Sequence, residues 1–239
     1  MLRAQQLPSI ETLLPRLYAY ADHYRATLPS LTCDESITSQ KVRNGKVHKE
    51  VKVESTLTEV RDRPEPTPFS ERHAFKTVDG RPPKPTFKLP FMVQGGFANG
   101  VGFSQPGAQE CFDYHLGALD GGANLRLEVD LKPGIADPKC KDVPEGSQKT
   151  VLVDVATGRI THVERTISTK AAKQRNEVYF IAIDYGPQEL GDKTFWLPVK
   201  LFAHDPKDEG RMTVIYSNFH RFAGELKVLP GNDADSQKR

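Results

Sequence analysis

The sequence predicts a mainly β protein of the α+β class: a strongly curved antiparallel sheet, or half-barrel, with an N-terminal helix packed on its concave or open side. Three observations lead to this prediction. Residues 9–28 show the apolar periodicity of a helix. Most of the later chain alternates apolar and polar residues, as strands with one buried and one wet face do. Turn signals separate these alternating segments at short intervals, which favours antiparallel neighbours.

Length and composition agree with one folded domain. The chain has 239 residues, of which 37% are hydrophobic, so it is long enough to bury a core. We expect one domain over residues 1–230 and a disordered C-terminal tail over residues 231–239, where the sequence is polar. The net charge of +2 gives no electrostatic reason to expect a nucleic-acid partner. No apolar run approaches the ~20 residues of a membrane-spanning helix, so a transmembrane protein is not expected.

The N-terminal helix is predicted over residues 9–28. Thr12 is a better N-cap than Ser9 in this prediction, because Pro15 is tolerated in a first turn but removes a hydrogen bond from a helix interior. Pro29 ends the helix. Its apolar side chains recur three and four positions apart and form one stripe: Ile10, Leu13, Leu14, Leu17, Ala21, Tyr24 and Leu28.

The first strands are predicted to form a hairpin. Residues 47–58 alternate apolar and polar side chains, and Asn44-Gly45 just before them is a hairpin turn signal. The partner strand is expected near residues 33–42. The next segment, residues 61–90, contains seven prolines, and this density favours edge segments and long loops over central strands.

The remaining chain is predicted to be almost entirely strands and turns, which gives nine to eleven strands in total. One helix cannot cover the apolar face of so wide a sheet, so the sheet must either curl into a half-barrel or stack as a sandwich. A curled sheet with a helix at its open side tends to leave an apolar cavity. The expected strands after the first hairpin are residues 72–78, 111–119, 125–132, 151–155, 160–167, 178–185, 195–203 and 212–222.

The three cysteines, Cys33, Cys111 and Cys140, bear on the cellular compartment. The hairpin turn at residues 120–122 brings the end of its second strand back beside Cys111, and Cys140 follows shortly after that end. We therefore expect a Cys111–Cys140 disulfide, which implies an oxidising compartment such as the periplasm or the exterior. The alternative is three free thiols in a cytoplasmic protein. The first residues lack the apolar core of a signal peptide, so either the leader is not part of this chain or the protein is cytoplasmic.

The sequence offers little catalytic chemistry. None of the seven histidines has metal-ligand spacing, so neither a metal nor another cofactor is expected. Asp113 and His115 lie two positions apart on one expected strand and share a face. That face is the polar one, which favours a solvated surface over a general-base pair or half of a metal site. An enzyme would need a cleft that joins this pair to another histidine, such as His162 or His220.

The segment from residue 150 to residue 222 carries an ordered series of turn motifs. It contains Val-Asp-x-x-Thr-Gly-x-Ile at 153–160, Asp-Tyr-Gly at 184–186, Leu-Pro-Val at 197–199 and Asn-Phe at 218–219. This series resembles the LolA-like lipoprotein-carrier superfamily of the periplasm, the outer-membrane lipoprotein-sorting proteins and their relatives. Within it the chain looks most similar to secreted members of acidobacterial type. The resemblance implies a half-barrel whose apolar cavity, closed by lid helices, holds acyl chains; here a single helix, over residues 9–28, is expected.

The function expected from these observations is a non-catalytic, extracytoplasmic binding or carrier protein. Its ligand would be apolar (a lipid, an acyl chain or a lipoprotein) and would lie in the concave cavity of the sheet. One alternative is a cell-envelope protein-interaction or structural module, whose concave face is filled by its own side chains and whose partner is another envelope protein. The second alternative is an enzyme that uses the Asp113/His115 region. The candidate cavity-lining residues are Val51, Val53, Phe112, Tyr114, Leu127, Val129, Ile181, Ile183, Val199 and Val214.

Overall fold

The computed structural model describes residues 8–61, 69–93, 97, 109–120, 123–135, 138–140, 147–167, 179–207 and 209–221. The predicted tail, residues 231–239, lies outside these ranges, and the domain boundary at residue 230 stays a prediction. The helical elements are α1 (Ile10–Thr27) and the short 3-10 helices η2 (Gln109–Cys111) and η3 (Pro138–Cys140). The strands are β1 (Leu31–Arg43), β2 (Lys46–Arg61), β3 (Phe69–Val78), β4 (Phe112–Asp120), β5 (Asn124–Leu131), β6 (Ser147–Asp154), β7 (Ile160–Ile167), β8 (Tyr179–Leu190), β9 (Lys193–Asp205) and β10 (Gly210–Arg221).

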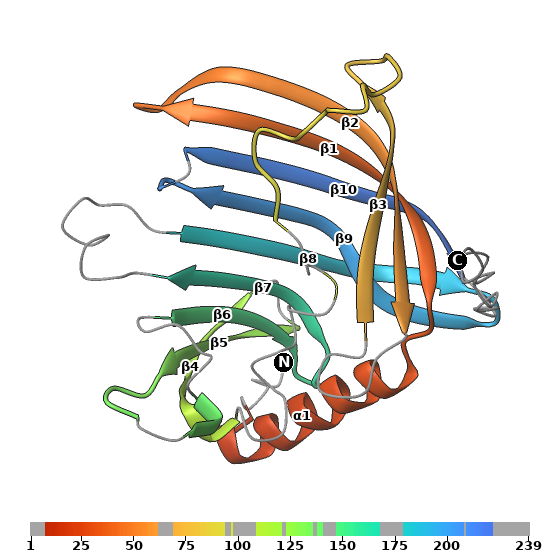
Figure 1. Ribbon diagram of the computed structural model, residues 1–239. Helices are drawn as coiled ribbons and strands as arrows, with labels where there is room; N and C mark the ends of the chain where they lie inside the picture. The colour runs from red at the N-terminus through yellow and green to blue at the C-terminus, as the bar shows by residue number, and fades with distance from the viewer. Residues whose placement is uncertain are drawn as a thin grey trace, which may run out of the picture.

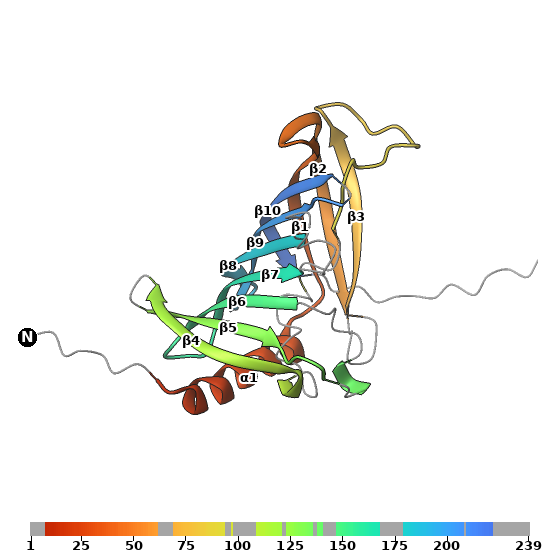
Figure 2. The ribbon, with the colours of Figure 1, turned by 90° about the vertical axis from the view of Figure 1, so that its left-hand side faces the viewer.

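All the described strands belong to one antiparallel sheet. The sheet has 10 strands in the order β3-β2-β1-β10-β9-β8-β7-β6-β5-β4. Figures 1 and 2 show that it is strongly curved, with β3 and β4 at its two free margins. Since these two edge strands do not pair with each other, the sheet is an open half-barrel. The predicted fold class is therefore confirmed, and the sandwich alternative is wrong.

The hairpin between β1 and β2 forms where the Asn-Gly signal predicted it. Asn44 and Gly45 have φ angles of +49° and +74°, the left-handed conformation that a tight two-residue turn requires at both positions. Val42 faces Val47 across the two strands, and the pairing continues to Leu31 opposite Glu59. The resulting long ribbon, with β3 added at its free side, forms one wall of the half-barrel.

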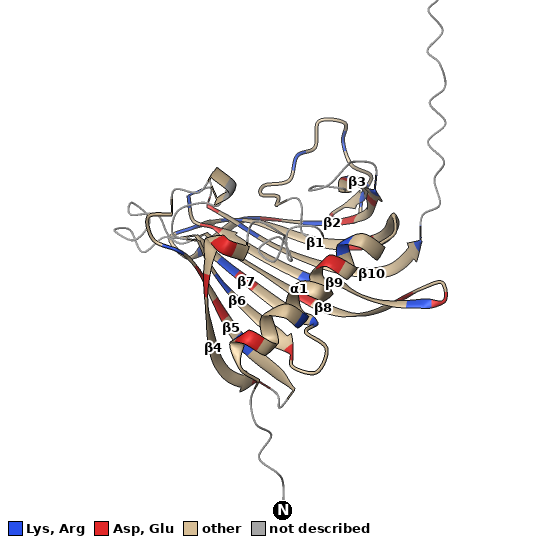
Figure 3. Cartoon of the chain, turned by 90° about the horizontal axis from the view of Figure 1, so that it is seen from below, with Lys and Arg blue, Asp and Glu red and all other residues tan. Residues whose placement is uncertain are grey.

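Helix α1 lies where it was predicted, but its N-cap is a different residue from the one the sequence favoured. Its N-cap is Ser9, and Thr12 lies inside the first turn, where its hydroxyl donates a 2.9 Å hydrogen bond to the Ser9 carbonyl. The preference for Thr12 as the cap is thus wrong, and Pro15 lies within the helix. The apolar stripe is present as predicted, because Leu13, Leu17, Ala21 and Tyr24 are all buried. Figure 1 shows α1 along the lower end of the sheet, and the view from below in Figure 3 shows it lying across the strands.

Polar contacts hold both ends of α1 to the sheet. Near its N-terminus, the Arg16 guanidinium donates to the Val155 carbonyl at 2.9 Å, in the turn between β6 and β7. At its C-terminus, the Arg61 guanidinium donates to the carbonyls of Leu28, at 3.2 Å, and of Arg25. A cation at a helix C-terminus satisfies carbonyls that have no partner within the helix. These contacts place α1 between the end of β2 and the β6–β7 turn.

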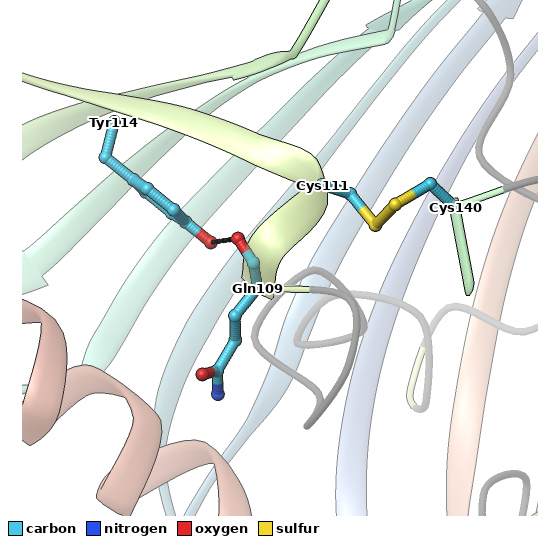
Figure 4. The surroundings of a disulfide bond; sticks show 4 residues. All are labelled: Gln109, Cys111, Tyr114 and Cys140. Carbon is cyan, nitrogen blue, oxygen red and sulfur yellow. Dashed lines mark hydrogen bonds between the residues drawn. A yellow bond between two sulfur atoms is a disulfide. The ribbon is translucent and has the colours of Figure 1, made fainter. Parts of the chain in front are cut away.

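The disulfide between Cys111 and Cys140 joins η2 to η3 (Figure 4), with a Cα–Cα distance of 5.6 Å. The pair is the one that the hairpin argument selected. In the same region the Tyr114 hydroxyl donates to the Gln109 carbonyl at 3.4 Å. Cys33 has no disulfide and is buried in β1.

We expect removal of this disulfide to lower the free energy of unfolding by ~3 kcal/mol, since the bond closes a loop between residues 29 apart in sequence and so restricts the unfolded chain. The test is urea unfolding of the Cys111→Ser/Cys140→Ser variant, followed by circular dichroism. The control is the wild-type protein in reducing buffer, which should show the same loss. Unchanged midpoints in both samples would contradict this prediction.

Candidate functional site

Nine of the ten residues predicted to line a cavity belong to the core on the concave face or pack against it. Seven are buried there: Val51, Val53, Phe112, Leu127, Val129, Ile183 and Val214. Tyr114 and Ile181 are partly buried and pack against the same cluster. These side chains form cross-strand rows such as Leu127, Val151 and Val163. Much of this face is therefore filled by the protein's own side chains and by the apolar stripe of α1.

Val199 is the exception among the ten. The register of β8 and β9 shifts between Asp184 and Tyr185. This shift changes which side chains of β9 point to the concave face. One Val199 methyl lies 3.1 Å from the position where a Cβ on Gly186 would be, whereas the neighbouring Tyr185 is part of the core. Placing Val199 among the concave apolar residues from simple alternation was therefore wrong.

A pocket of about 430 Å³ lies between α1 and the start of β9. Aromatic side chains from the helix and from the strand form two of its walls. None of the ten predicted residues lines it. Its lining residues are Tyr20, His23, Tyr24 and Thr27 of α1, Thr157 and Arg159 of the β6–β7 turn, and Lys193, Thr194, Phe195 and Trp196 of β9.

One polar group of the pocket is held in position by its neighbours. The Arg159 guanidinium lies over the Trp196 ring, 3.9 Å from its centroid, and forms a 3.4 Å ion pair with Asp154. Asp154 in turn accepts hydrogen bonds from the backbone NH of Thr157 at 2.9 Å and from its hydroxyl at 2.7 Å. The Thr-Gly turn recognised in the sequence thus builds one side of the pocket.

Two tyrosines of α1, Tyr20 and Tyr24, line the pocket, and Tyr185 of β8 lies near Tyr24. Tyr24 is 4% exposed and Tyr185 is 6% exposed, and neither hydroxyl has a hydrogen-bond partner within the described chain. Burial raises the pKa of Tyr24 well above its usual value. Burial also raises the pKa of Tyr20 to about 12, against an opposing effect of the Arg159 charge. All three phenols are therefore protonated at neutral pH and available as hydrogen-bond donors.

A second polar group lies buried on the concave side of β1 and β3. The His73 Nδ1 is 2.8 Å from a Glu35 carboxylate oxygen, and its Nε2 is 3.9 Å from Glu71. The side chains are 10% exposed for His73 and 1% exposed for Glu35. Burial opposes the charged imidazole, but the hydrogen bond to Glu35 and the charges of Glu35 and Glu71 outweigh it and raise the His73 pKa. The arrangement is a buried hydrogen bond between an imidazole and a carboxylate, and the raised pKa favours the charged imidazole.

Cys33 lies near the Glu35 carboxylate of this group and is 2% exposed. Burial, together with the charges of Glu35 and other nearby carboxylates, raises the pKa of its thiol. A thiol becomes a nucleophile only as the thiolate, so Cys33 is not suited to nucleophilic chemistry.

The convex face carries a polar groove of about 470 Å³ across β4 to β8. His162 in this groove lies between two carboxylates, with Nδ1 2.6 Å from Asp184 and Nε2 3.3 Å from Glu164. Nearby, Thr150 donates to Glu128 at 2.9 Å, and Arg126 contacts both. This side chain network occupies the polar side of the strands.

Asp113 and His115 lie on the edge strand β4, away from His162. His115 faces Glu128 on β5, Glu128 faces Thr150 on β6, and Thr150 faces Glu164 on β7. Three strand spacings of ~4.8 Å therefore separate His115 from the row next to His162, a distance of roughly 14 Å. His220 lies on β10, which is further away in the strand order. The sheet does not bring together the residues that the enzyme alternative needs.

The described residues contain no group of three or more His, Cys, Asp or Glu side chains arranged to hold a metal ion. No helix among them is both long enough and apolar enough to cross a bilayer. Figure 3 shows acidic and basic residues interspersed on α1 and along the strands.

The charged residues on the concave face were not predicted from the sequence. Glu35 stands between Cys33 and Ile37 in the alternation of β1, and Lys149 precedes Val151 and Val153 in the alternation of β6. Each of these charged residues has buried neighbours two positions before and after it, and these neighbours are apolar except for Ser147. That pattern was a readable signal for buried polar groups, since charges are rarely buried without a role or a partner. No comparable signal pointed to the pocket beside Trp196.

No family model matches the chain, and no curated protein sequence matches it. Among solved structures it is similar to a DUF1329 family protein from Desulfovibrio piger, with a TM-score of 0.43 and 12% identity over 89% of this chain and 94% of that one. It is also similar to a LolA superfamily protein from Nitrosomonas europaea (TM-score 0.40, 10% identity, 91% and 96% covered). A third is an outer-membrane lipoprotein-sorting protein domain from Vibrio parahaemolyticus (TM-score 0.42, 11% identity, 90% and 95% covered).

These similarities concern the overall arrangement of the chain, and no ligand, partner or activity is taken from them. The fold of this chain is an open antiparallel half-barrel with a helix across one end.

Proposed function

We propose that the protein is a non-catalytic, extracytoplasmic binding protein that holds an apolar ligand, a lipid or an acyl chain, at the concave side of its sheet. The observation that carries this proposal is the pocket of about 430 Å³ between α1 and β9. Aromatic walls are typical of sites for apolar groups, and a few polar side chains at the rim give such sites orientation. Trp196, Phe195 and Tyr20 form the walls, and Arg159 and Lys193 lie among the polar lining.

The disulfide supports the extracytoplasmic part of the proposal. Disulfides persist in the periplasm and outside the cell, and they are rare in the reducing cytoplasm. Cys111 and Cys140 are both buried and bonded. A carrier of lipids or lipoproteins in the cell envelope would work in such a compartment.

Burial of apolar surface supplies the binding energy in this proposal. At ~25 cal/mol per Å², a ligand segment that loses 200 Å² of apolar surface gains about 5 kcal/mol before the entropic cost of association. This gain is enough for binding in the micromolar range when the ligand has further contacts.

Trp196 makes the proposal directly testable, because it is the one tryptophan of the chain and it lines the pocket. The methyl ester of 11-dansylaminoundecanoate is an uncharged apolar probe whose dansyl group accepts energy from tryptophan. We expect the probe to quench Trp196 emission saturably and to shift its own emission to the blue.

A pair of variants assigns the site. Tyr20→Ala removes an aromatic wall and should weaken probe binding about tenfold, because a buried aromatic ring contributes roughly 1.5 kcal/mol or more. Phe202→Ala removes a ring of similar size that packs against Phe180, away from the pocket, and should leave binding unchanged. Absence of saturable quenching, or equal weakening by both variants, would contradict the proposal and favour a protein-interaction module.

A further inference from the structure

The pocket between α1 and β9 contains a buried hydroxyl that makes no hydrogen bond within the described chain. Tyr24 of α1 is one of the lining residues and is 4% exposed. Its hydroxyl has no hydrogen-bond partner there. A buried donor without a partner costs free energy, and a ligand oxygen that accepts a hydrogen bond from it would recover that cost. A ligand with an acceptor next to Tyr24 therefore fits this pocket better than a pure hydrocarbon does.

The phenols beside Tyr24 do not satisfy its hydroxyl. Tyr20 lies one turn earlier on α1, and the two ring centroids are 6.3 Å apart. Tyr185 of β8 interacts electrostatically with Tyr24, and its own hydroxyl also lacks a partner in the described chain. A phenol can accept a hydrogen bond as well as donate one, so these groups would satisfy one another if they were within reach. The donor of Tyr24 thus remains available on the pocket side.

The cationic side chains of the pocket give little reason to expect an anionic ligand. The Arg159 guanidinium already has the Asp154 carboxylate as its partner, at 3.4 Å. His23 and Lys193 are exposed at the rim, where water and salt screen their charge. The described lining contains no carboxylate, so its buried part offers donors rather than a net charge.

A negative charge behind the pocket acts against an anion. The Glu59 carboxylate of β2, together with burial, raises the pKa of Tyr24, which shows that this charge lies within electrostatic range of the phenol. A ligand anion placed next to the Tyr24 hydroxyl would be repelled by Glu59 and would also lose its hydration. An uncharged acceptor avoids both costs.

We propose that Tyr24 recognises the polar end of the ligand by donating a hydrogen bond to an uncharged carbonyl oxygen, that of an ester or an amide, while the apolar chain packs on Phe195 and Trp196. This assignment rests on the proposed function, because it specifies the ligand class of the same pocket. A carbonyl oxygen accepts hydrogen bonds through two lone pairs and carries no net charge. It therefore matches a site that has an unused donor and a negative charge nearby.

The experiment compares two uncharged competitors that differ at one group: 1-lauroylglycerol and 1-O-dodecylglycerol, in which a methylene replaces the ester carbonyl. Each is used below its micelle concentration, at pH 8, to displace the dansyl methyl ester, and its affinity is corrected for the probe affinity of each variant. We expect the wild-type protein to bind lauroylglycerol about fivefold more tightly than the ether, the effect of one hydrogen bond between uncharged groups. Dodecanoate, which is ionised at this pH, should bind no more tightly than the ether.

Tyr24→Phe removes the hydroxyl and keeps the ring. This variant should lose the preference for lauroylglycerol and bind the ether as the wild type does. The matched control is Tyr18→Phe on the same helix, because Tyr18 does not line the pocket and its hydroxyl is bonded to Tyr114. The control should keep the preference. In urea without ligand, Tyr24→Phe should unfold at a midpoint no lower than that of the wild type, since its hydroxyl has no bond to lose, whereas Tyr18→Phe should unfold at a lower one.

Equal binding of the ester and the ether by the wild-type protein would overturn this assignment and leave the proposed function standing. The same conclusion would follow from a preference that survives in Tyr24→Phe, or from tighter binding of dodecanoate than of lauroylglycerol. A lower urea midpoint for Tyr24→Phe would mean that the hydroxyl has a partner in the free protein, which contradicts the assignment. Failure of the dansyl ester to bind at all would overturn the two proposals together.

Discussion

Replacing Gly158 by alanine is expected to lower the free energy of unfolding by about 4 kcal/mol, enough to prevent folding of a marginally stable domain. Two effects add. Gly158 has a φ of +74°, where an alanine is strained by ~1 kcal/mol or more. A Cβ at this position would also lie 2.5 Å from the carbonyl carbon of Arg16 and 2.6 Å from its oxygen. Backbone atoms cannot rotate away as a side chain can, so α1 would have to move.

The matched control is Gly191→Ala in the β8–β9 hairpin. Gly191 has nearly the same φ, +72°, but no atom lies within 4 Å of its Cβ position. This variant should lose ~1 kcal/mol, the conformational part alone. Urea unfolding of both variants measures the difference. Equal losses would mean that the close approach of Gly158 to α1 does not contribute to stability.

The same pair of variants also tests where the ligand binds. Gly158 lies between Thr157 and Arg159, which line the pocket beside Trp196. If Gly158→Ala still folds, displacement of α1 should widen the pocket and weaken binding of the dansyl ester, whereas Gly191→Ala should bind it as the wild type does.

Replacing His73 by leucine is expected to cost ~3 kcal/mol, because it leaves the Glu35 carboxylate buried without its cationic partner. Glu35 is 1% exposed, so water cannot replace the imidazole without rearrangement. His73→Gln keeps a hydrogen-bond donor but no charge, and should lose less. The control is Lys76→Met on the same strand, which removes an ion pair with Asp34 in which both side chains are exposed. Exposed pairs contribute little, so this variant should be close to wild type.

The pH dependence of this effect has a definite sign. The His73 pKa is raised in the folded protein, so the ion pair contributes fully below the unfolded-state pKa near 6.5, and its contribution is lost as pH rises through the folded-state value. Lys149 acts in the opposite direction. Its pKa is lowered to about 7 in the folded protein, so its penalty diminishes as pH rises from about 7 toward 10.

The quantity to measure is therefore the difference in unfolding free energy between wild type and His73→Gln at each pH, in which the Lys149 effect cancels. This difference should be largest below pH 6.5 and should decrease as pH rises above it. A constant difference from pH 5.5 to 9 would show that His73 is not charged in the folded protein.

Local patterns in the sequence were sufficient for the strands and for the first hairpin. Alternation along residues 47–58 requires one buried face, and Asn44-Gly45 supplies the two left-handed residues of the turn. The cysteine pairing followed from the same reasoning, because a short hairpin brings its two ends together. These features depend on residues that are neighbours in the chain or across one turn.

Irregularities within elements were not predictable in this way. Val199 was placed on the wrong face because β9 has one extra residue, a β-bulge, opposite β8. This extra residue reverses which side chains of β9 point to the concave face. The N-cap of α1 was misassigned to Thr12 because Pro15 was expected in the first turn, whereas the helix begins at Ile10 and contains Pro15 in its interior.

The sequence by itself determined the fold class, the succession of strands, the apolar stripe of α1 and the Cys111–Cys140 pair. Only the tertiary structure decided that the sheet stays open, that Lys149 meets Arg165, and that a pocket forms beside Trp196. The physical reason is the separation of the contributing segments. The pocket requires residues 20–27, 157–159 and 193–196 to meet, and their meeting depends on the curvature of the whole sheet and on the close approach of α1 to Gly158.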